Sequence, residues 1–452
     1  MKRPTTFKAL ICIIVALLLA AKPAHLHAQQ FADGPITVDD AVAIGLRQSR
    51  PLEIARLDRD LARQKIRETW SQVLPQLTSG LTYTRTLEPS VLLLPPNPFA
   101  PNGVLEVSSD NALHATLDLR QTLFDGSAFA GIKAAGNVRR MSDEAYRATG
   151  ATIVSNIRIA YFDVLIAEEQ LKLIEQSIER WKTARKDTKA MFRQGLVADI
   201  DTLRAHLSVE NLRPDLLRAT NRVVSSRTSL KNAMGVANDL RLNLVTKLEP
   251  RSIAVPQTLR EACDEALLKR PELNQLTWQL KAEGNKVSAA WAQHLPVLSA
   301  FGRLESQTAF NDGIDANWTS SSSVGLQLTL PIFSGFRTSA LIEQARLGEL
   351  QTRSRLDDLR TNIYAEVETR LADYNESQQR LDIQSKTIAL AERGYRITTL
   401  RYREGLGSRL ELSDAELQLD KAKTNYLQAV YDNLVAGTLL EKALGRTGGV
   451  TP

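Results

Sequence analysis

The stretch Tyr402–Leu412 reads YREGLGSRLEL, and a closely similar stretch, FRQGLVADIDTL, stands at Phe192–Leu203 in the first half of the chain. In each, an aromatic residue and an arginine precede a glycine, a leucine follows it, and an acidic residue comes later. Each stretch interrupts a long run of helical periodicity. Two equivalent turns in two long helices predict that the chain consists of two copies of one plan.

Both predicted copies open in the same way, at Thr37 and Thr258. Each threonine is followed three residues later by an acid, which is typical of a capping box at the start of a helix. A proline follows an arginine in each copy, at Pro51 and Pro271. The resulting division is an N-terminal segment 1–28, a first repeat 29–248, a linker 249–257, a second repeat 258–446 and a C-terminal tail 447–452.

A pair of strands is predicted in each copy, at about 77–124 and about 297–333. Apolar and polar residues alternate from Leu113 to Leu123 and again from Val324 to Ile332. Alternation with period two indicates strands that have one apolar face. Loops rich in Pro, Asn, Gly, Asp and Ser separate the strands of each pair.

A very long helical pattern follows each strand pair, from about Ser127 to Arg193 and from about Arg337 to Arg403. At 1.5 Å per residue, such a helix is about 100 Å long. Apolar residues recur along it at three-, four- and seven-residue spacings, as at Ile157, Tyr161 and Val164. Spacing of this kind over such a length predicts coiled-coil-like packing instead of a compact globule.

The first residues have the features of a secretory signal peptide. Basic residues precede an apolar run from Ala9 to Ala21, and small residues lead to an expected cleavage after Ala28. That run is too short to anchor the protein across a bilayer. The chain of 452 residues has a formal charge of +6, and removal of four basic residues with the signal leaves 6 − 4 = +2. This balance does not favour a nucleic-acid partner.

Cysteine content gives a further expectation for an exported protein. Cys12 lies in the signal segment, so Cys263 remains alone and cannot form an intramolecular disulfide. Cys12 has no suitable small residue before it for lipid attachment, and Cys263 is expected to be a small buried residue.

Four strands cannot close a barrel with a usable lumen. Left open, their edges would remain unpaired. We therefore expect several chains to share one barrel, with apolar residues facing outward and polar residues inward, as in outer-membrane barrels. Each strand pair returns to its starting side, so the helices should all extend from the same side of the membrane. This describes a short barrel joined to a long helical duct.

The order of these motifs resembles that of the TolC-like outer membrane efflux proteins. The resemblance rests on the paired turns, on LPQL and LPVL (Leu74–Leu77 and Leu295–Leu298), and on LFDG and IFSG (Leu123–Gly126 and Ile332–Gly335). It implies a mainly α fold in a homotrimer, whose chains contribute four strands each to a 12-stranded transmembrane barrel. The long helices would form an α-barrel in the periplasm, and each repeat would be an outer membrane efflux repeat.

The resemblance also implies a function. The protein would be the passive exit duct of a tripartite pump in the outer membrane, in contact with its lipid and with a periplasmic adaptor (membrane fusion) protein and an inner-membrane transporter. Small toxic molecules or drugs are the expected cargo; type I protein secretion and metal-ion efflux are alternatives. No catalytic residue, cofactor or metal site is expected. A structural coiled-coil protein of the envelope and an exported enzyme are the competing classes.

By the same resemblance, the two turns form the closed end of the duct. Asp201 would bond Tyr402, and Glu411 and Asp414 would form a ring of carboxylates that favours cations. An arginine expected two residues after the second glycine is replaced by Gly407, and Ile200 cannot make the second link through its side chain. A gate with fewer links than usual is therefore predicted. The tip residues expected to dock the adaptor are Gly195, Leu196, Gly405 and Leu406.

Overall fold

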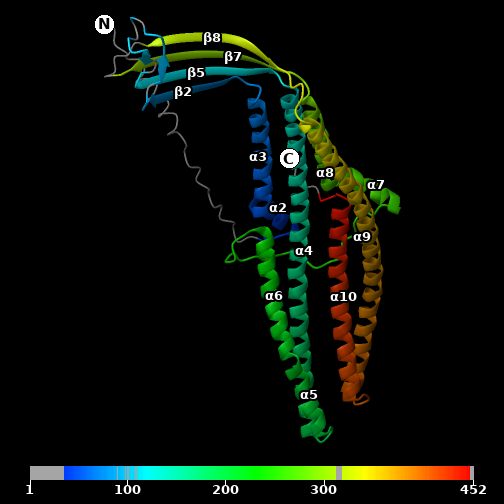
Figure 1. The fold of residues 1–452 in the computed structure, drawn as a ribbon. Coiled ribbons are helices and arrows are strands. Elements are labelled where there is room, and N and C mark those ends of the chain that lie inside the picture. The colour runs from blue at the N-terminus through cyan, green and yellow to red at the C-terminus, as the bar shows by residue number, and fades with distance from the viewer. Residues whose placement is uncertain are drawn as a thin grey trace.

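The computed structural model describes residues 35–88, 90–96, 98, 101–106, 109–311 and 318–447. The predicted signal segment 1–28 and most of the C-terminal tail lie outside the described residues. Figure 1 shows an elongated molecule in which a curved sheet lies at one end and all the long helices run away from it. This arrangement follows from the chain order, because each strand pair begins and ends beside a helix.

The main sheet has four antiparallel strands in the order β2-β5-β7-β8. They are β2 (Gln76–Arg85), β5 (Asn111–Phe124), β7 (Val297–Phe310) and β8 (Thr319–Thr329). β5, β7 and β8 fall within the two predicted strand ranges, and β2 begins one residue before its range, at Gln76. β8 ends before the predicted Ile332 because Pro331 cannot donate a backbone hydrogen bond to a neighbouring strand.

The first loop between strands contains a feature that the sequence did not reveal. It was predicted to be irregular, but β3 (Val91–Leu93) and β4 (Val104–Glu106) pair as a small antiparallel hairpin. Its strands are only three residues long, so they are too short for period-two alternation to indicate them.

Nine helices occur in the part of the chain that the structure describes. The first half contains α2 (Val38–Gln48), α3 (Arg50–Ser71), α4 (Gly126–Arg193), α5 (Asp199–Asn211) and α6 (Arg213–Met234). The second half contains α7 (Leu259–Lys269), α8 (Pro271–Ala292), α9 (Arg337–Arg403) and α10 (Arg409–Ala443). The bounds of α4 and α9 agree closely with the two predicted long helices.

Local signals set where these helices begin. Thr37 accepts a hydrogen bond from the Asp40 backbone, and the Asp40 carboxylate accepts one from the Thr37 backbone, which completes the predicted capping box of α2. Thr258 likewise accepts from the Glu261 backbone at the start of α7. Asp125 caps α4 by accepting from the backbone of Ser127 and Ala128.

Two hydrophobic clusters hold the helices together. In the first, Ile157 and Val164 of α4 pack with Leu230 of α6 and with Val430 of α10. In the second, Val367 of α9 packs with Leu440 and with Cys263, which is buried as predicted. The apolar stretch of α4 is long enough to cross a membrane by length and composition, but 67% of it is buried inside the protein. It is therefore the central helix of the bundle.

Tyr161 joins this core to the start of the described chain. Its hydroxyl donates to the Ile36 carbonyl at 2.8 Å and lies 3.0 Å from the Thr246 hydroxyl. Ile36 belongs to β1 (Pro35–Ile36), which pairs in parallel with β6 (Asn243–Leu244). The tyrosine therefore ties two segments that are distant in sequence to the middle of α4.

We expect Tyr161→Phe to lower the free energy of unfolding by about 0.5–1.5 kcal/mol, because the hydrogen bond from the Tyr161 hydroxyl to the half-buried Ile36 carbonyl would be lost. Urea unfolding of the purified protein in detergent measures this change. Tyr364→Phe, at an exposed position of α9, is the control and should have little effect. Equal stabilities of the Tyr161→Phe variant and the wild type would contradict the assignment.

Candidate gate at the helical tip

The two tip turns have the same backbone geometry. Gly195 and Gly405 adopt positive φ values of 73° and 72°, which favour glycine. After them, the Leu196 amide donates to the Met191 carbonyl at 3.0 Å, and the Leu406 amide donates to the Arg401 carbonyl at 2.8 Å. This pattern ends a helix and satisfies its last carbonyl groups. The repeated sequence therefore builds two equivalent helix-to-helix turns.

Leu196 and Leu406 are exposed on these turns, with 67% and 72% of their surface accessible. A tight turn with an exposed leucine offers an apolar contact surface. The predicted docking role of Gly195, Leu196, Gly405 and Leu406 stays a prediction in a single chain.

The predicted gate pair, Asp201 and Tyr402, occupies two different surroundings. Tyr402 is 7% exposed, and its hydroxyl donates to the Met191 sulfur at 3.6 Å. Asp201 lies in the first turn of α5, where its carboxylate is 4.0 Å from Arg204. Within one chain, the hydroxyl of Tyr402 therefore has a partner on α4.

Glu411 and Asp414 both lie exposed near the start of α10. Ser408 caps this helix by accepting a hydrogen bond from the Glu411 backbone at 3.1 Å. The Glu411 carboxylate is 4.0 Å from Arg401. Both acids are thus held at the tip on a capped helix end and are available to face a lumen.

Arg409 does not replace the arginine that is missing at Gly407. It is turned inward and is only 8% exposed, and its guanidinium lies over the Trp181 ring of α4 at 5.1 Å. Within one chain the Arg409 guanidinium is therefore taken up by Trp181, and a second turn without this link stays a prediction.

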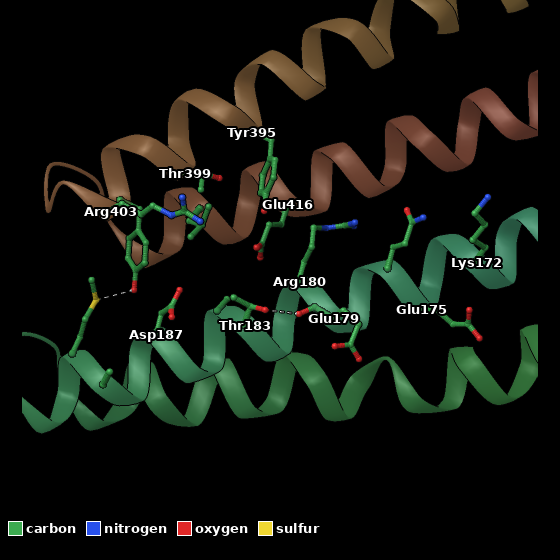
Figure 2. A pocket seen from close by; sticks show the side chains of 16 residues that line it. Lys172, Glu175, Glu179, Arg180, Thr183, Asp187, Tyr395, Thr399, Arg403 and Glu416 are labelled. Carbon is green, nitrogen blue, oxygen red and sulfur yellow. Dashed lines mark hydrogen bonds between the residues drawn. The ribbon is translucent and has the colours of Figure 1, made fainter.

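A groove runs between α4 and the α9–α10 pair just above the tip (Figure 2). It has a volume of about 890 Å³. Glu416 and Arg180 face one another across it, and Tyr395 and Arg403 lie on the α9 side. Charged groups thus border the groove from all three helices.

The buried charges beside this groove were not predicted from the sequence. Arg409, Leu412, Glu416 and Leu419 follow the spacing of a coiled-coil seam on α10, and all are buried. Two of the four are charged, in a seam that is normally apolar. This irregularity in the seam was the signal that could have identified them. No group of three or more His, Cys, Asp or Glu side chains that could hold a metal ion occurs in the part of the chain that the structure describes.

Comparison with known proteins identifies the family. The model of the family described as Outer membrane efflux protein matches residues 45–236 and 262–446. The chain belongs to the outer membrane efflux protein family. Its members are transport channels of the outer membrane, and the long helices of this family member form a large periplasmic part.

Relatives of the chain are known by sequence and by structure. It is 25% identical to outer membrane protein TolC of Escherichia coli K12 over 417 residues, covering 88% of this chain and 80% of TolC. It is 22% identical to the toluene efflux pump outer membrane protein TtgC of Pseudomonas putida over 420 residues, covering 92% and 84%. The crystal structure of CusC superposes with a TM-score of 0.77 at 20% identity, covering 94% of this chain and 96% of CusC. The fold is therefore that of the outer membrane efflux channels.

Proposed function

We propose that three copies of this chain form a passive duct, which spans the outer membrane as a 12-stranded barrel and crosses the periplasm as a helical tube. The observation that carries this proposal is the sheet, because one chain leaves both of its edges unpaired and one of its faces apolar. An isolated sheet of this kind would expose main-chain groups and hydrophobic surface that a closed barrel in lipid would satisfy.

The strand register supports closure into a ring. The edge strands β2 and β8 run in opposite directions, because three antiparallel pairings separate them. β8 of one chain can therefore pair antiparallel with β2 of the next. Four strands are too few for a lumen, whereas twelve strands from three chains suffice.

The two faces of the sheet differ as a membrane barrel requires. Leu77, Leu119 and Val324 occupy one face at the same level across the sheet, and Val324 is 88% exposed. On the opposite face, Arg303 bonds Asp118 at 2.5 Å. His114 lies 3.2 Å from Glu305 on the same face. Apolar residues would face lipid, and a polar face of mixed charge would line the lumen.

The helices carry two further unpartnered seams. On α5 and α6, exposed apolar residues recur at seven-residue heptad positions. On α9, Ile383, Leu390 and Ile397 follow the same spacing, and Leu400 adds a further position. The members of the α5–α6 seam are Ile200, Leu203, Leu207, Leu217 and Val224. Both seams approach the tip, so the seam of one chain can cover the other seam of its neighbour.

Self-association provides the first test. We expect Leu203→Glu combined with Leu217→Glu to convert the trimer to smaller species, because two carboxylates per interface would be buried in an apolar seam. Light scattering of the detergent-solubilised protein after size-exclusion chromatography measures the mass. Ser225→Glu combined with Ser229→Glu is the matched control on α6. A wild-type protein that is monomeric under these conditions would contradict the proposal.

Conductance separates a duct from a structural coiled-coil protein of the envelope. The purified wild type should be extracted from the outer membrane only by detergent and should form ion-conducting pores in planar bilayers. A soluble or non-conducting protein would instead favour the structural alternative.

The partners follow from the shape of the proposed duct. A tube without an energy source needs an inner-membrane transporter and a periplasmic adaptor, which we place at the exposed tip turns. Small toxic molecules are the cargo we favour, in line with the named role of TtgC, and type I protein secretion and metal-ion efflux are the alternatives. Loss of resistance to organic solvents and drugs in a deletion strain, without loss of a secreted protein, would support this choice.

We further propose that Glu411 and Asp414 of three chains form a ring at the closed end, and that Asp201 and Tyr402 contribute to its closure. The exposure of both acids at the capped start of α10 supports the ring. With Gly407 in place of an arginine, this gate has fewer links between chains.

A further inference from the structure

The side chains in the seam between α10 and α4 change from apolar to charged along its length. In its upper part, Val430 and Leu434 pack with Ile157 and Val164 in the main hydrophobic cluster. Near the tip, charged residues take the place of apolar ones on both helices. One end of the seam is therefore fixed by apolar burial, whereas the other end buries charged side chains.

Arg409 and Glu416 occupy successive equivalent positions in the tip part of this seam. Glu416 is 2% exposed and Arg409 is 8% exposed, and their charged groups are 4.0 Å apart. At this distance the two groups attract each other but do not form a hydrogen bond. The Arg409 Nη1 and Nη2 atoms and the Glu416 Oε2 atom are buried without a hydrogen-bond partner among the described residues. When both groups are charged, such an incompletely satisfied pair contributes little to stability.

The pair faces α4 through a second ion pair. Arg180 of α4 bonds Asp420 of α10, and Ser177 donates to the same carboxylate. Arg409 contacts the Trp181 ring. The groups that face Glu416 are thus Arg409 and Asp420 on its own helix, Arg180 on α4, and Tyr395 and Arg403 across the groove on α9.

We infer that Arg409 and Glu416 form a proton-responsive latch, which holds the first turns of α10 against α4 and sets how readily the tip opens. This inference rests on the proposed function, because it assigns a regulatory element to the gate of the duct. The latch acts within one chain and compensates for the link that Gly407 cannot make between chains. The apolar upper seam would remain packed while the tip separates.

The sign of the response follows from the surroundings of Glu416. Burial raises its pKa to about 7 from 4.5, and this effect exceeds the opposing effects of Arg409 and Arg180. A carboxyl with a raised pKa takes up a proton more readily when buried than when exposed. Falling pH therefore favours the packed tip, and rising pH through about 7 favours separation, where the carboxylate is hydrated.

The size of the response can be stated as a ratio. If Glu416 has its ordinary pKa in the separated tip, the ratio of separated to packed tips should rise about tenfold between about pH 6 and about pH 8. Two measurements on the full-length protein report it. Single-channel recording gives the open fraction, and hydrogen exchange of the amides in residues 409–420, corrected for the chemical rate, gives the local opening.

Glu416→Gln tests the latch, because it keeps the shape of the side chain and removes its titration. At about pH 8 this variant should have a lower ratio of separated to packed tips than the wild type has even at about pH 6, with both pH responses lost. Arg409→Gln removes a charge that lowers the pKa of Glu416, so its midpoint should move to higher pH. Glu175→Gln, an exposed acid beside the same groove, is the control and should keep the wild-type response.

The outcomes separate this inference from the proposed function. A pH response that is unchanged in Glu416→Gln would overturn the latch while leaving the duct intact. A protein that never conducts would contradict the duct, and hydrogen exchange would still test the latch. Slow exchange around Val430 in every variant confirms that the upper seam is folded. If exchange around Val430 is fast in Glu416→Gln, the upper seam of that variant is not folded. The shift of the pH midpoint in Arg409→Gln then tests the latch instead.

Discussion

Val324→Arg should abolish assembly in the outer membrane. Val324 lies at the middle of β8 on the apolar face, at the level of Gly302 on β7. An arginine facing lipid at the bilayer midplane costs about 2–4 kcal/mol in a transmembrane barrel. Three copies of the substitution would cost about 6–12 kcal/mol per trimer, which is similar to the whole stability of an ordinary domain. Fractionation of the membranes followed by a heat-modifiability gel measures assembled protein.

Ser321→Arg is the matched control for this prediction. Ser321 is on the same strand but on the opposite face, where it pairs with Glu305 of β7. An arginine there would project into water and toward a carboxylate, so assembly should remain near the wild-type level. Equal assembly of Val324→Arg and Ser321→Arg would mean that the apolar face does not contact lipid. The proposed transmembrane barrel would then be wrong.

Glu411→Gln combined with Asp414→Asn should remove the cation preference of the duct. Threefold symmetry would place six carboxylates around one constriction, and each pair of charges a few ångströms apart in water interacts by about 1 kcal/mol. We therefore expect the ratio of cation to anion permeability to fall roughly fivefold or more. Reversal potentials in a KCl gradient across a planar bilayer measure this ratio.

The control for the ring removes the same number of charges elsewhere at the tip. Asp199 begins α5 and Glu404 lies in the second turn, and both are exposed. Asp199→Asn combined with Glu404→Gln should change selectivity much less, because these acids lie outside the proposed constriction. If both double variants lower selectivity equally, the effect comes from the general charge of the tip and the ring is wrong.

The sequence by itself determined the order and kind of the elements. Three local features show this: the helix starts at Thr37 and Thr258, the ends of both long helices at Gly195 and Gly405, and the alternating strands. A capping box, a glycine at positive φ and a repeat of two or seven residues act over a few neighbouring residues, so the chain shows them directly. The small hairpin of β3 and β4 was not predicted, because its strands are too short to show period-two alternation.

Only the tertiary structure decided which side of each element is covered. Arg409 follows a helix start and would ordinarily be assigned to solvent, yet α4 covers it and Trp181 receives its guanidinium. Glu416 is buried for the same reason, and Tyr402 contacts Met191 from another helix. Burial is set by residues far away in the chain, so the seam spacing of Arg409 and Glu416 could mark them as unusual but could not show what covers them. The stretch Tyr402–Leu412 thus determined the turn by itself. The packing of α10 on α4 determined which residues after the turn are buried.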